Sequence, residues 1–343
     1  MANPENNIMD APARDEGSID TKAVREELSA FSENFLRVKA EISKRIAGYG
    51  QTIEMILYTL FAGGHVLLEG VPGIGKTQMV KTIADVFSLK FKRIQFTPDL
   101  MPSDVLGSHV LVEDEKGGNH LKFNEGPVFC NVLLADEINR ATPKTQSALL
   151  ECMGEGTVTV ANMRFSLVQP FFVLATENPL EMEGTFPLPE AQLDRFMMKI
   201  NLPYPSFEQL QVIADRFASA EPPSVAQILG SDSINRMQSL VRKMILPDDV
   251  KNYAITVIKK THPDFADSPQ QVKKYVKYGS SPRGLLSLIL TAKARAIVEG
   301  RVNVSYDDVR NVAQNVLNHR IILNFEGLAE GVSASEIINQ AVN

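Results

Sequence analysis

The segment that most constrains the fold of this chain reads GVPGIGKT and runs from Gly70 to Thr77. It matches the phosphate-loop pattern G-x-x-x-x-G-K-S/T at every defined position. A short apolar run with strand character, residues 65–69, precedes it, and residues 78–87 follow with apolar side chains at helical spacing. Strand, glycine-rich turn and helix are the context that the pattern requires. The sequence therefore predicts an α/β fold with a phosphate-binding loop.

The residue types in this loop fit the chemistry of a bound triphosphate. Glycine lets successive backbone N–H groups turn towards one anion, and the N-terminus of the following helix adds partial positive charge. Lys76 can reach the β- and γ-phosphates, and the hydroxyl of Thr77 can ligate Mg²⁺. A glycine-rich turn without a ligand is the alternative. The residues expected to bind the nucleotide are Gly70, Val71, Pro72, Gly73, Ile74, Gly75, Lys76, Thr77 and Gln78.

Length and composition set the broad class of protein. With 343 residues the chain has room for two domains of ~150 residues each. Its 44% hydrophobic and 22% charged residues are typical of a soluble globular protein. No apolar run approaches the ~20 residues that a bilayer crossing needs, and the first residues contain no apolar core of a signal peptide. We therefore expect no membrane span.

The cysteines, histidines and net charge bear on the compartment and on the partners. Cys130 and Cys152 lie in apolar contexts, so buried free thiols are expected, which indicates a reducing compartment and a cytoplasmic location. The five histidines form no cluster with metal-ligand spacing. A net charge of −6 disfavours nucleic acid as a partner, since contact with phosphates needs a basic surface.

Strand-like and helical segments alternate between residues 52 and 201, which predicts a parallel sheet covered by helices. Five buried strands are expected, at residues 65–69, 91–96, 131–136, 171–175 and 197–200. Two polar, β-prone segments interrupt this alternation, and each predicts a hairpin with turn residues at its tip. They are residues 109–123, turning at 116–119, and residues 157–167, turning at 161–162.

The pattern divides the chain into three parts. Residues 1–20 are polar and are expected to be a disordered tail. Residues 21–205 are predicted to form the nucleotide-binding core, with the two hairpins as inserts. At Ser206 a capping-box pattern with Gln209 begins a helix, and the periodicity from there on is almost entirely helical. Residues 206–343 are therefore expected to form a smaller all-α domain.

Two carboxylates, Asp136 and Glu137, end the third predicted strand. Ligands of a parallel sheet bind beyond the carboxyl ends of its strands, so both residues are expected beside the phosphate loop. Asp136 can hold Mg²⁺ through water, and Glu137 can orient and deprotonate an attacking water. A strand that merely ends in an acidic turn is the alternative, and the nearby loop weakens it.

Three more residues are candidates, each with a common structural alternative. Asn178 follows the fourth predicted strand, where its amide could bind the γ-phosphate or the lytic water, but spacing alone favours an Asn-Pro turn. Arg195 ends a short helix, and Arg283 begins a helix together with Pro282. Either guanidinium could stabilise charge on a transferring phosphoryl group. For either residue the alternative is a surface arginine that pairs with Asp194 or with a backbone carbonyl.

Together these motifs resemble those of AAA+ ATPases, and the finer match is to the MoxR type. The resemblance covers most of the chain and implies a P-loop AAA+ core with a parallel five-stranded sheet, followed by a small all-α lid domain. It rests on four long strings: QFTPDLMPSD at residues 95–104, NEGPVF at 124–129, ADEINRA at 135–141 and EGTFPLPEAQLDRF at 183–196.

The resemblance implies ATP and Mg²⁺ as cofactors. Lys76 and Thr77 would belong to the Walker A motif, and Asp136 and Glu137 to Walker B. The adenine would lie near residues 46–51, although AGYGQ at 47–51 departs from the usual Val-Gly-Gln stretch.

The resemblance also implies an assembly in which subunits share a site. Asn178 would be sensor 1 and Arg283 sensor 2. Arg195 would be an arginine finger that reaches the nucleotide of the next subunit in a ring, expected to be a hexamer. Arg140 is a second candidate at that interface. The two hairpins would face the ring pore or a partner.

A MoxR-like chain is expected to couple ATP hydrolysis to chaperone-like remodelling or maturation of a protein client, with metal insertion as one form of maturation. The expected partner is a protein with a von Willebrand factor A domain. A nucleic-acid motor or a regulatory ATPase with the same core is the alternative. The first predicted hairpin of this chain weakens that alternative. It would be a poor phosphate-binding surface, because Glu113, Asp114 and Glu115 accompany Lys116 and Lys122.

Overall fold

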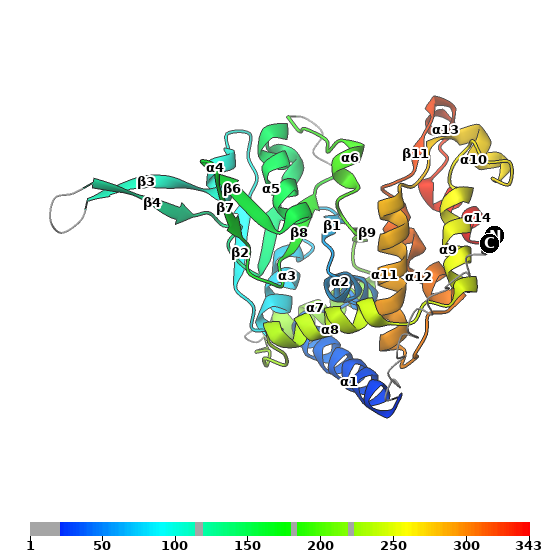
Figure 1. Cartoon of the computed structure of the whole chain (residues 1–343), viewed down its shortest axis with the longest axis horizontal. Helices are drawn as coiled ribbons and strands as arrows, with labels where there is room; N and C mark the ends of the chain where they lie inside the picture. Colours follow the sequence, from blue (N-terminus) through cyan, green and yellow to red (C-terminus); the bar gives the residue numbers. More distant parts are fainter. Residues whose placement is uncertain (1–20, 114–118, 180–183, 219–222) are drawn as a thin grey trace, which may run out of the picture.

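The computed structural model describes residues 21–113, 119–179, 184–218 and 223–343. The tail expected at residues 1–20 lies outside the described residues, as does most of the turn expected at 116–119. Figure 1 shows the sheet with its helices at one side and a bundle of helices from the C-terminal part of the chain at the other.

Five parallel strands form the central sheet, in the order β2-β5-β8-β1-β9. This confirms the predicted parallel five-stranded sheet, and each predicted segment holds one strand whose ends differ by one or two residues from those expected. The strands are β1 (Val66–Glu69), β2 (Phe91–Gln95), β5 (Val132–Asp136), β8 (Phe172–Glu177) and β9 (Met198–Asn201).

The central strands are apolar on both faces because helices cover both. In β5, Val132 and Leu134 join one buried cluster, whereas Leu133 and Ala135 join another, since successive side chains of a strand point to opposite faces. The first cluster includes residues of α1 (Thr21–Arg45), α2 (Gly50–Ala62) and α3 (Lys76–Val86) and continues into the helices after β9, whereas the second includes α4 (Pro102–Leu106) and α5 (Pro143–Glu155).

Two antiparallel hairpins stand on the α4–α5 side of the sheet. They are β3 (Gly107–Glu113) with β4 (Asn119–Glu125), and β6 (Thr157–Val160) with β7 (Met163–Ser166). The first projects far from the body of the molecule (Figure 1). At its base Phe123 stacks on Phe165 with ring centroids 4.3 Å apart, so the two hairpins contact each other.

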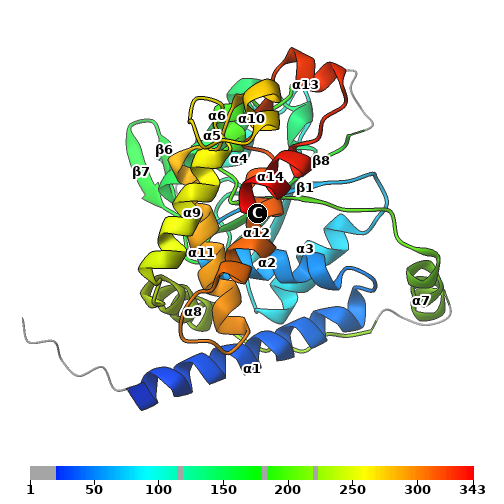
Figure 2. The same ribbon diagram turned by 90° about the vertical axis from the view of Figure 1, so that its right-hand side faces the viewer.

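Helices dominate the chain after β9, as predicted. Ser206 caps the first of them: its hydroxyl accepts the N–H of Gln209 at 3.3 Å, and the Gln209 amide oxygen accepts the N–H of Ser206 at 2.9 Å. Figure 2 shows this helix, α7, apart from the helices that follow it. The helices are α7 (Phe207–Phe217), α8 (Ser231–Lys243), α9 (Asp248–Lys260), α10 (Gln270–Tyr275), α11 (Pro282–Val298), α12 (Tyr306–Leu317), α13 (Phe325–Ala329) and α14 (Ala334–Val342).

One small sheet in this helical part was not predicted. β10 (Val276–Tyr278) pairs antiparallel with β11 (Ile322–Leu323), while residues 301–304, the segment with the strongest strand pattern here, contribute only a bridge from Asn303 to Ile245. Strands of two or three residues are too short to show an alternating pattern. Tertiary pairing of distant segments creates them.

The two cysteines are free and buried, as expected. Burial raises the pKa of both the Cys130 and the Cys152 thiol to about 12, so neither is a reactive thiolate. None of the helices in the described part of the chain combines the length and the apolar character that a membrane crossing requires.

Candidate nucleotide-binding site

The predicted phosphate loop connects β1 to α3 at the carboxyl edge of the sheet. Gly73 and Gly75 have φ of 83° and 89°, a region that residues with a Cβ rarely adopt. A Cβ at either position would meet no atom within 4 Å, so this face of the loop is open towards a ligand. α3 then begins at Lys76 without a side-chain cap, which leaves its first N–H groups directed at the loop.

Lys76 is buried and its ammonium group donates to the carbonyl oxygen of Gly70 at 2.7 Å, so the side chain folds back across the loop. Burial lowers the pKa of Lys76, and the nearby carboxylates of Asp136 and Glu137 oppose that shift. The fold therefore brings these three predicted residues, Lys76, Asp136 and Glu137, into electrostatic contact.

Asp136 ends β5 with both carboxylate oxygens bonded. The hydroxyl of Thr176 donates to Oδ1 at 2.6 Å, and Arg93 donates to Oδ2 through Nη2 at 2.7 Å. Thr176 is itself buried at the end of β8 and accepts the backbone N–H of Glu137 at 2.8 Å. One threonine thus holds both predicted carboxylate residues in place.

Glu137 lies just beyond the strand with φ 55° and ψ 51°, a left-handed conformation that is costly for a residue with a side chain. Its Oε2 accepts from Gln95 Nε2 at 2.7 Å and from Arg140 Nη1 at 2.9 Å. Both partners are polar and stand at the same edge of the sheet. Such strain is typical of functional sites, because surrounding contacts must maintain it.

Sequence reasoning did not find Thr176, Arg93 or Gln95. These residues could have been found only with the strand order, which the sequence does not show. In the structure β2 pairs with β5 so that Gln95 lies opposite Asp136, and β5 pairs with β8. The same order explains the place of Asn178. It is buried directly after β8, at the edge where Asp136 also stands.

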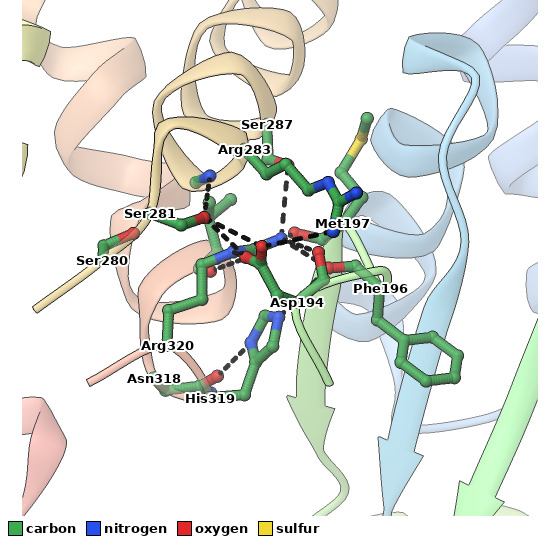
Figure 3. A network of polar contacts seen from close by, with 12 residues as sticks. Asp194, Phe196, Met197, Ser280, Ser281, Arg283, Ser287, Asn318, His319 and Arg320 are labelled. Carbon is green, nitrogen blue, oxygen red and sulfur yellow. Dashed lines mark hydrogen bonds and ion pairs between the residues drawn. The ribbon is translucent and has the colours of Figure 1, made fainter. Parts of the chain in front are cut away.

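The two predicted arginines contact other regions. Arg195 Nη1 donates to the carbonyl oxygen of Leu150 in α5 at 3.0 Å. Arg283, with a side chain that is 59% exposed, has its Nη1 3.7 Å from Oδ2 of Asp194 (Figure 3). Both alternatives that the sequence left open are therefore present: a backbone carbonyl for Arg195 and the ion pair with Asp194 for Arg283.

A cavity of about 520 Å³ adjoins the loop, a volume in the usual range for small-ligand pockets. Ile46, Ala47 and Tyr49 line it, in the segment expected near the adenine. Its opposite wall comes from the β9–α7 connection and from α7, which sequence reasoning missed. The lining residues are Arg45, Ile46, Ala47, Tyr49, Pro72, Gly73, Ile74, Gly75, Gln78, Tyr204, Pro205, Leu210 and Ile213.

The donor set fits Mg²⁺ bound together with phosphates. Among the described residues no group of three or more His, Cys, Asp or Glu side chains could hold a metal unaided. Mg²⁺ does not need one, because it retains waters and takes one or two protein oxygens plus phosphate oxygens. The hydroxyl of Thr77, at the first turn of α3, and the carboxylate of Asp136 are oxygen donors of that kind.

The fold and this site define the class of the protein as a P-loop ATPase with a helical lid. The profile of the "ATPase family associated with various cellular activities (AAA)" matches residues 65–198, and that of the AAA lid domain matches residues 269–341.

Full-length relatives identify the family. The chain is 41% identical to Chaperone MoxR1 of Mycobacterium tuberculosis, over 92% of this chain and 83% of that protein. It is 42% identical to protein YeaC of Bacillus subtilis, over 88% and 91% of the two chains. A crystal structure of a candidate ATPase from Cytophaga hutchinsonii superimposes with a TM-score of 0.87 at 40% identity, covering 94% of this chain and 97% of that one. The chain belongs to the MoxR family of AAA+ ATPases.

Proposed function

We propose that this ATPase hydrolyses MgATP in a ring of identical subunits, a hexamer, and that the cycle remodels a protein client. The observation that carries the proposal is the convergence of Lys76, Asp136 and Glu137 at the open face of the phosphate loop. A binding scaffold does not need a second carboxylate in strained geometry beside the first.

The chemistry follows from the positions of these residues. Lys76 exchanges its bond to Gly70 for the β- and γ-phosphates. Thr77 and Asp136 would hold Mg²⁺, which would offset phosphate charge. Glu137 orients a water and takes its proton while the water oxygen bonds to the γ-phosphorus. The bond from the γ-phosphorus to the bridging oxygen breaks, and its electron pair remains on ADP.

Four further residues complete the proposed site. Asn178 binds the γ-phosphate or the water as sensor 1, and Arg283 acts on the nucleotide from the lid as sensor 2. Arg195 is the finger for the neighbouring subunit, with Arg140 at the same interface. Arg195 donates to α5 rather than to its own phosphate loop, which supports a role in trans.

The proposed client is a protein. The name of the relative Chaperone MoxR1 supports a chaperone-like role, and maturation with metal insertion and a von Willebrand factor A domain partner belong to the same proposal, as does a cytoplasmic location. The projecting hairpin exposes Leu111 and Leu121, which are 66% and 68% accessible and face each other across β3 and β4. Exposed leucines beside Glu113 favour a protein as the binding partner over nucleic acid.

The experiment measures ATP turnover per subunit against protein concentration, with particle mass recorded in the same samples. Turnover should rise as rings assemble. Arg195→Ala should assemble and lose ~10³-fold in turnover, the lower value for an arginine finger. Arg164→Ala is the matched control, because Arg164 is an exposed arginine whose partners are the Thr157 hydroxyl at 3.2 Å and Glu155 at 3.6 Å. Undiminished turnover of Arg195→Ala, or turnover independent of assembly, would refute the proposal.

A further inference from the structure

A buried arginine of the lid binds the segment that carries Arg195. The Arg320 side chain is only 2% exposed and extends from the C-terminal end of α12 into the junction between lid and sheet (Figure 3). It donates to Asp194 Oδ1 at 2.8 Å, to the Phe196 carbonyl oxygen at 2.6 Å and to the Met197 carbonyl oxygen at 3.2 Å. These acceptors lie immediately before and after Arg195.

Two more lid residues converge on the same carboxylate. The hydroxyl of Ser281, the N-cap of α11, lies 2.8 Å and 2.9 Å from the two oxygens of Asp194. Arg283, two residues on, has its Nη1 3.7 Å from Oδ2. Asp194 therefore connects α11 and α12 of the lid to the residue that precedes Arg195.

The lid is shaped to admit this contact. A Cβ at Gly284, in the first turn of α11, would lie 2.9 Å from Cδ of Arg320 and 2.0 Å from Oγ of Ser280. Beside it His319 contributes a second link, because its Nε2 is 3.1 Å from the Phe196 carbonyl oxygen. The ends of two lid helices thus hold one short stretch of the core.

Arg195 has a defined resting position in this arrangement. Its Nη1 bonds the Leu150 carbonyl oxygen, and a Cβ at Gly154 would lie 2.4 Å from the same nitrogen, so the side chain lies flat against α5. Any displacement of the backbone at 194–196 shifts the base of this side chain. Because the lid is hydrogen-bonded to the residues on both sides of Arg195, a movement of the lid would move this backbone segment with it.

We propose that Asp194 and Arg320 are positioning residues that couple the lid of each subunit to its own Arg195, so that the state of one nucleotide site sets the finger offered to the next. The proposal rests on the proposed role of Arg195 in trans. A largely buried charged pair is a weak source of stability compared with apolar packing. Its role here is to fix the position of residues 194–196 relative to the lid. The pair adds a specific polar link at residues 194–196 to the apolar packing that already joins the lid helices to the core.

A purely structural role predicts something different. The lid holds a fully buried carboxylate, Asp308, which accepts hydrogen bonds from Arg295 and Arg301 and stays within the lid. Asp308→Asn is therefore the control for Asp194→Asn, since each removes one carboxylate charge from facing arginines, and Asp308 is the more buried of the two. If both variants lose activity in proportion to their loss of thermal stability, no coupling exists.

The first measurement compares ATP binding and turnover in assembled rings. Asp194→Asn should keep its affinity for ATP within about twofold and lose at least ~10-fold in kcat, within the range of coupling between sites. Arg320→Gln should do the same if it folds. Asp308→Asn should keep kcat.

The second measurement mixes subunits. An Asp194→Asn subunit keeps a complete site of its own, whereas a Glu137→Gln subunit keeps a normal finger and cannot hydrolyse. Mixed rings should regain turnover, because the finger of one subunit serves the site of the other. Arg195→Ala mixed with Glu137→Gln is the reference pair.

The outcomes separate the two proposals. Recovery in both mixtures supports the coupling. Recovery with Arg195→Ala but not with Asp194→Asn overturns the coupling and leaves the proposed function intact. If neither mixture recovers turnover, the trans role of Arg195 is refuted, and the coupling is refuted with it.

Discussion

At the scale of single residues, the site depends on how few atoms hold its two carboxylates. Thr176 bonds the Asp136 carboxylate and the Glu137 backbone with one hydroxyl, and Gln95 and Arg140 bond the Glu137 carboxylate. Lys76, opposite, is bonded to its own loop. The proposed catalytic groups are thus held by neighbouring residues of the sheet edge and the loop.

Glu137→Gln should separate binding from hydrolysis. The amide keeps the shape and a hydrogen-bonding oxygen but cannot accept the water's proton, so kcat should fall by ~10²–10⁴-fold, the usual contribution of a general base. ATP affinity should change little, because the loop and Lys76 are untouched. Phosphate release and equilibrium nucleotide binding measure the two effects. A turnover close to that of the native chain would exclude Glu137 as the base.

Thr176→Val should weaken the site without changing its shape. Valine is nearly isosteric with threonine, but it leaves the Glu137 N–H and one Asp136 oxygen without this partner, at a cost of about 1–3 kcal/mol for a buried group. We expect a higher Mg²⁺ requirement and about tenfold lower kcat. Thr82→Val is the control, since Thr82 is equally buried and bonds only the Gln78 carbonyl of its own helix. Equal behaviour of the two variants in a Mg²⁺ titration would contradict the role of Thr176.

At the scale of elements, α7 is unusual because none of its described side chains is buried. Leu210 and Ile213 nevertheless line the cavity beside the loop, together with Tyr204 just before the helix. Figure 2 shows α7 standing apart from the other helices of the C-terminal part. A wall of this kind gains its apolar contacts from the ligand, so we expect it to contribute to nucleotide affinity.

Ile213→Asp tests the wall formed by α7. A carboxylate there would replace apolar lining and repel the triphosphate, so ATP affinity should fall roughly tenfold, which corresponds to about 1.4 kcal/mol. Val212→Asp is the matched control, because Val212 lies on the same helix, is 38% exposed and does not line the cavity. Titration with a fluorescent ATP analogue compares them. If Ile213→Asp binds ATP with unchanged affinity, the adenine does not lie against α7.

The hairpins are also elements whose contacts extend beyond their own strands. Phe123 of the first stacks on Phe165 of the second and packs edge-on against Phe129. Since each two-stranded hairpin would be marginal alone, this aromatic cluster stabilises both. The aromatic cluster also packs the base of the first hairpin, from which the strand segments with Leu111 and Leu121 extend.

At the scale of the whole molecule, two buried histidines connect distant parts of the core. His65 Nδ1 accepts the N–H of Val173 at 3.1 Å while Nε2 is 3.1 Å from the Met153 carbonyl oxygen, which suits only the neutral ring. Burial lowers the pKa of His65 to about 4. Burial also lowers the pKa of His319, at the junction of lid and sheet.

These shifts predict acid sensitivity. Between pH 6.5 and pH 4 the unfolded chain binds a proton at His65 that the folded chain excludes, so stability is complete above pH 6.5 and falls with pH, by ~3 kcal/mol at the low end. His65→Gln can make both hydrogen bonds without titrating, so it should reduce the difference in unfolding free energy between pH 7 and pH 5. His120→Gln, an exposed change on the hairpin, should not. Denaturant titrations at the two pH values measure this, and an identical pH dependence for His65→Gln would contradict the assignment.

Local pattern was sufficient for much of this molecule. The loop GVPGIGKT was predicted from the sequence because its binding groups are its own backbone and its last two residues, Lys76 and Thr77. The five strands were predicted because buried parallel strands are continuous apolar runs. The carboxylates after β5 could be placed because strand ends share one edge. The β10–β11 pair could not be predicted, because strands of two or three residues show no alternation. The helix α7 was predicted, but its position against the cavity was not, because its sequence does not show which part of the molecule it packs beside.

The sequence by itself determined what the chain binds and the class of fold that binds it. Only the tertiary structure decided what holds the proposed catalytic groups: Thr176 and Gln95 reach Asp136 and Glu137 across strand pairings. It alone brought Arg320 to Asp194 across 126 residues of chain. The physical reason is that a loop contacts its ligand through neighbours in sequence, whereas a carboxylate is oriented by whichever strands and helices pack beside it, and that packing is a property of the whole fold.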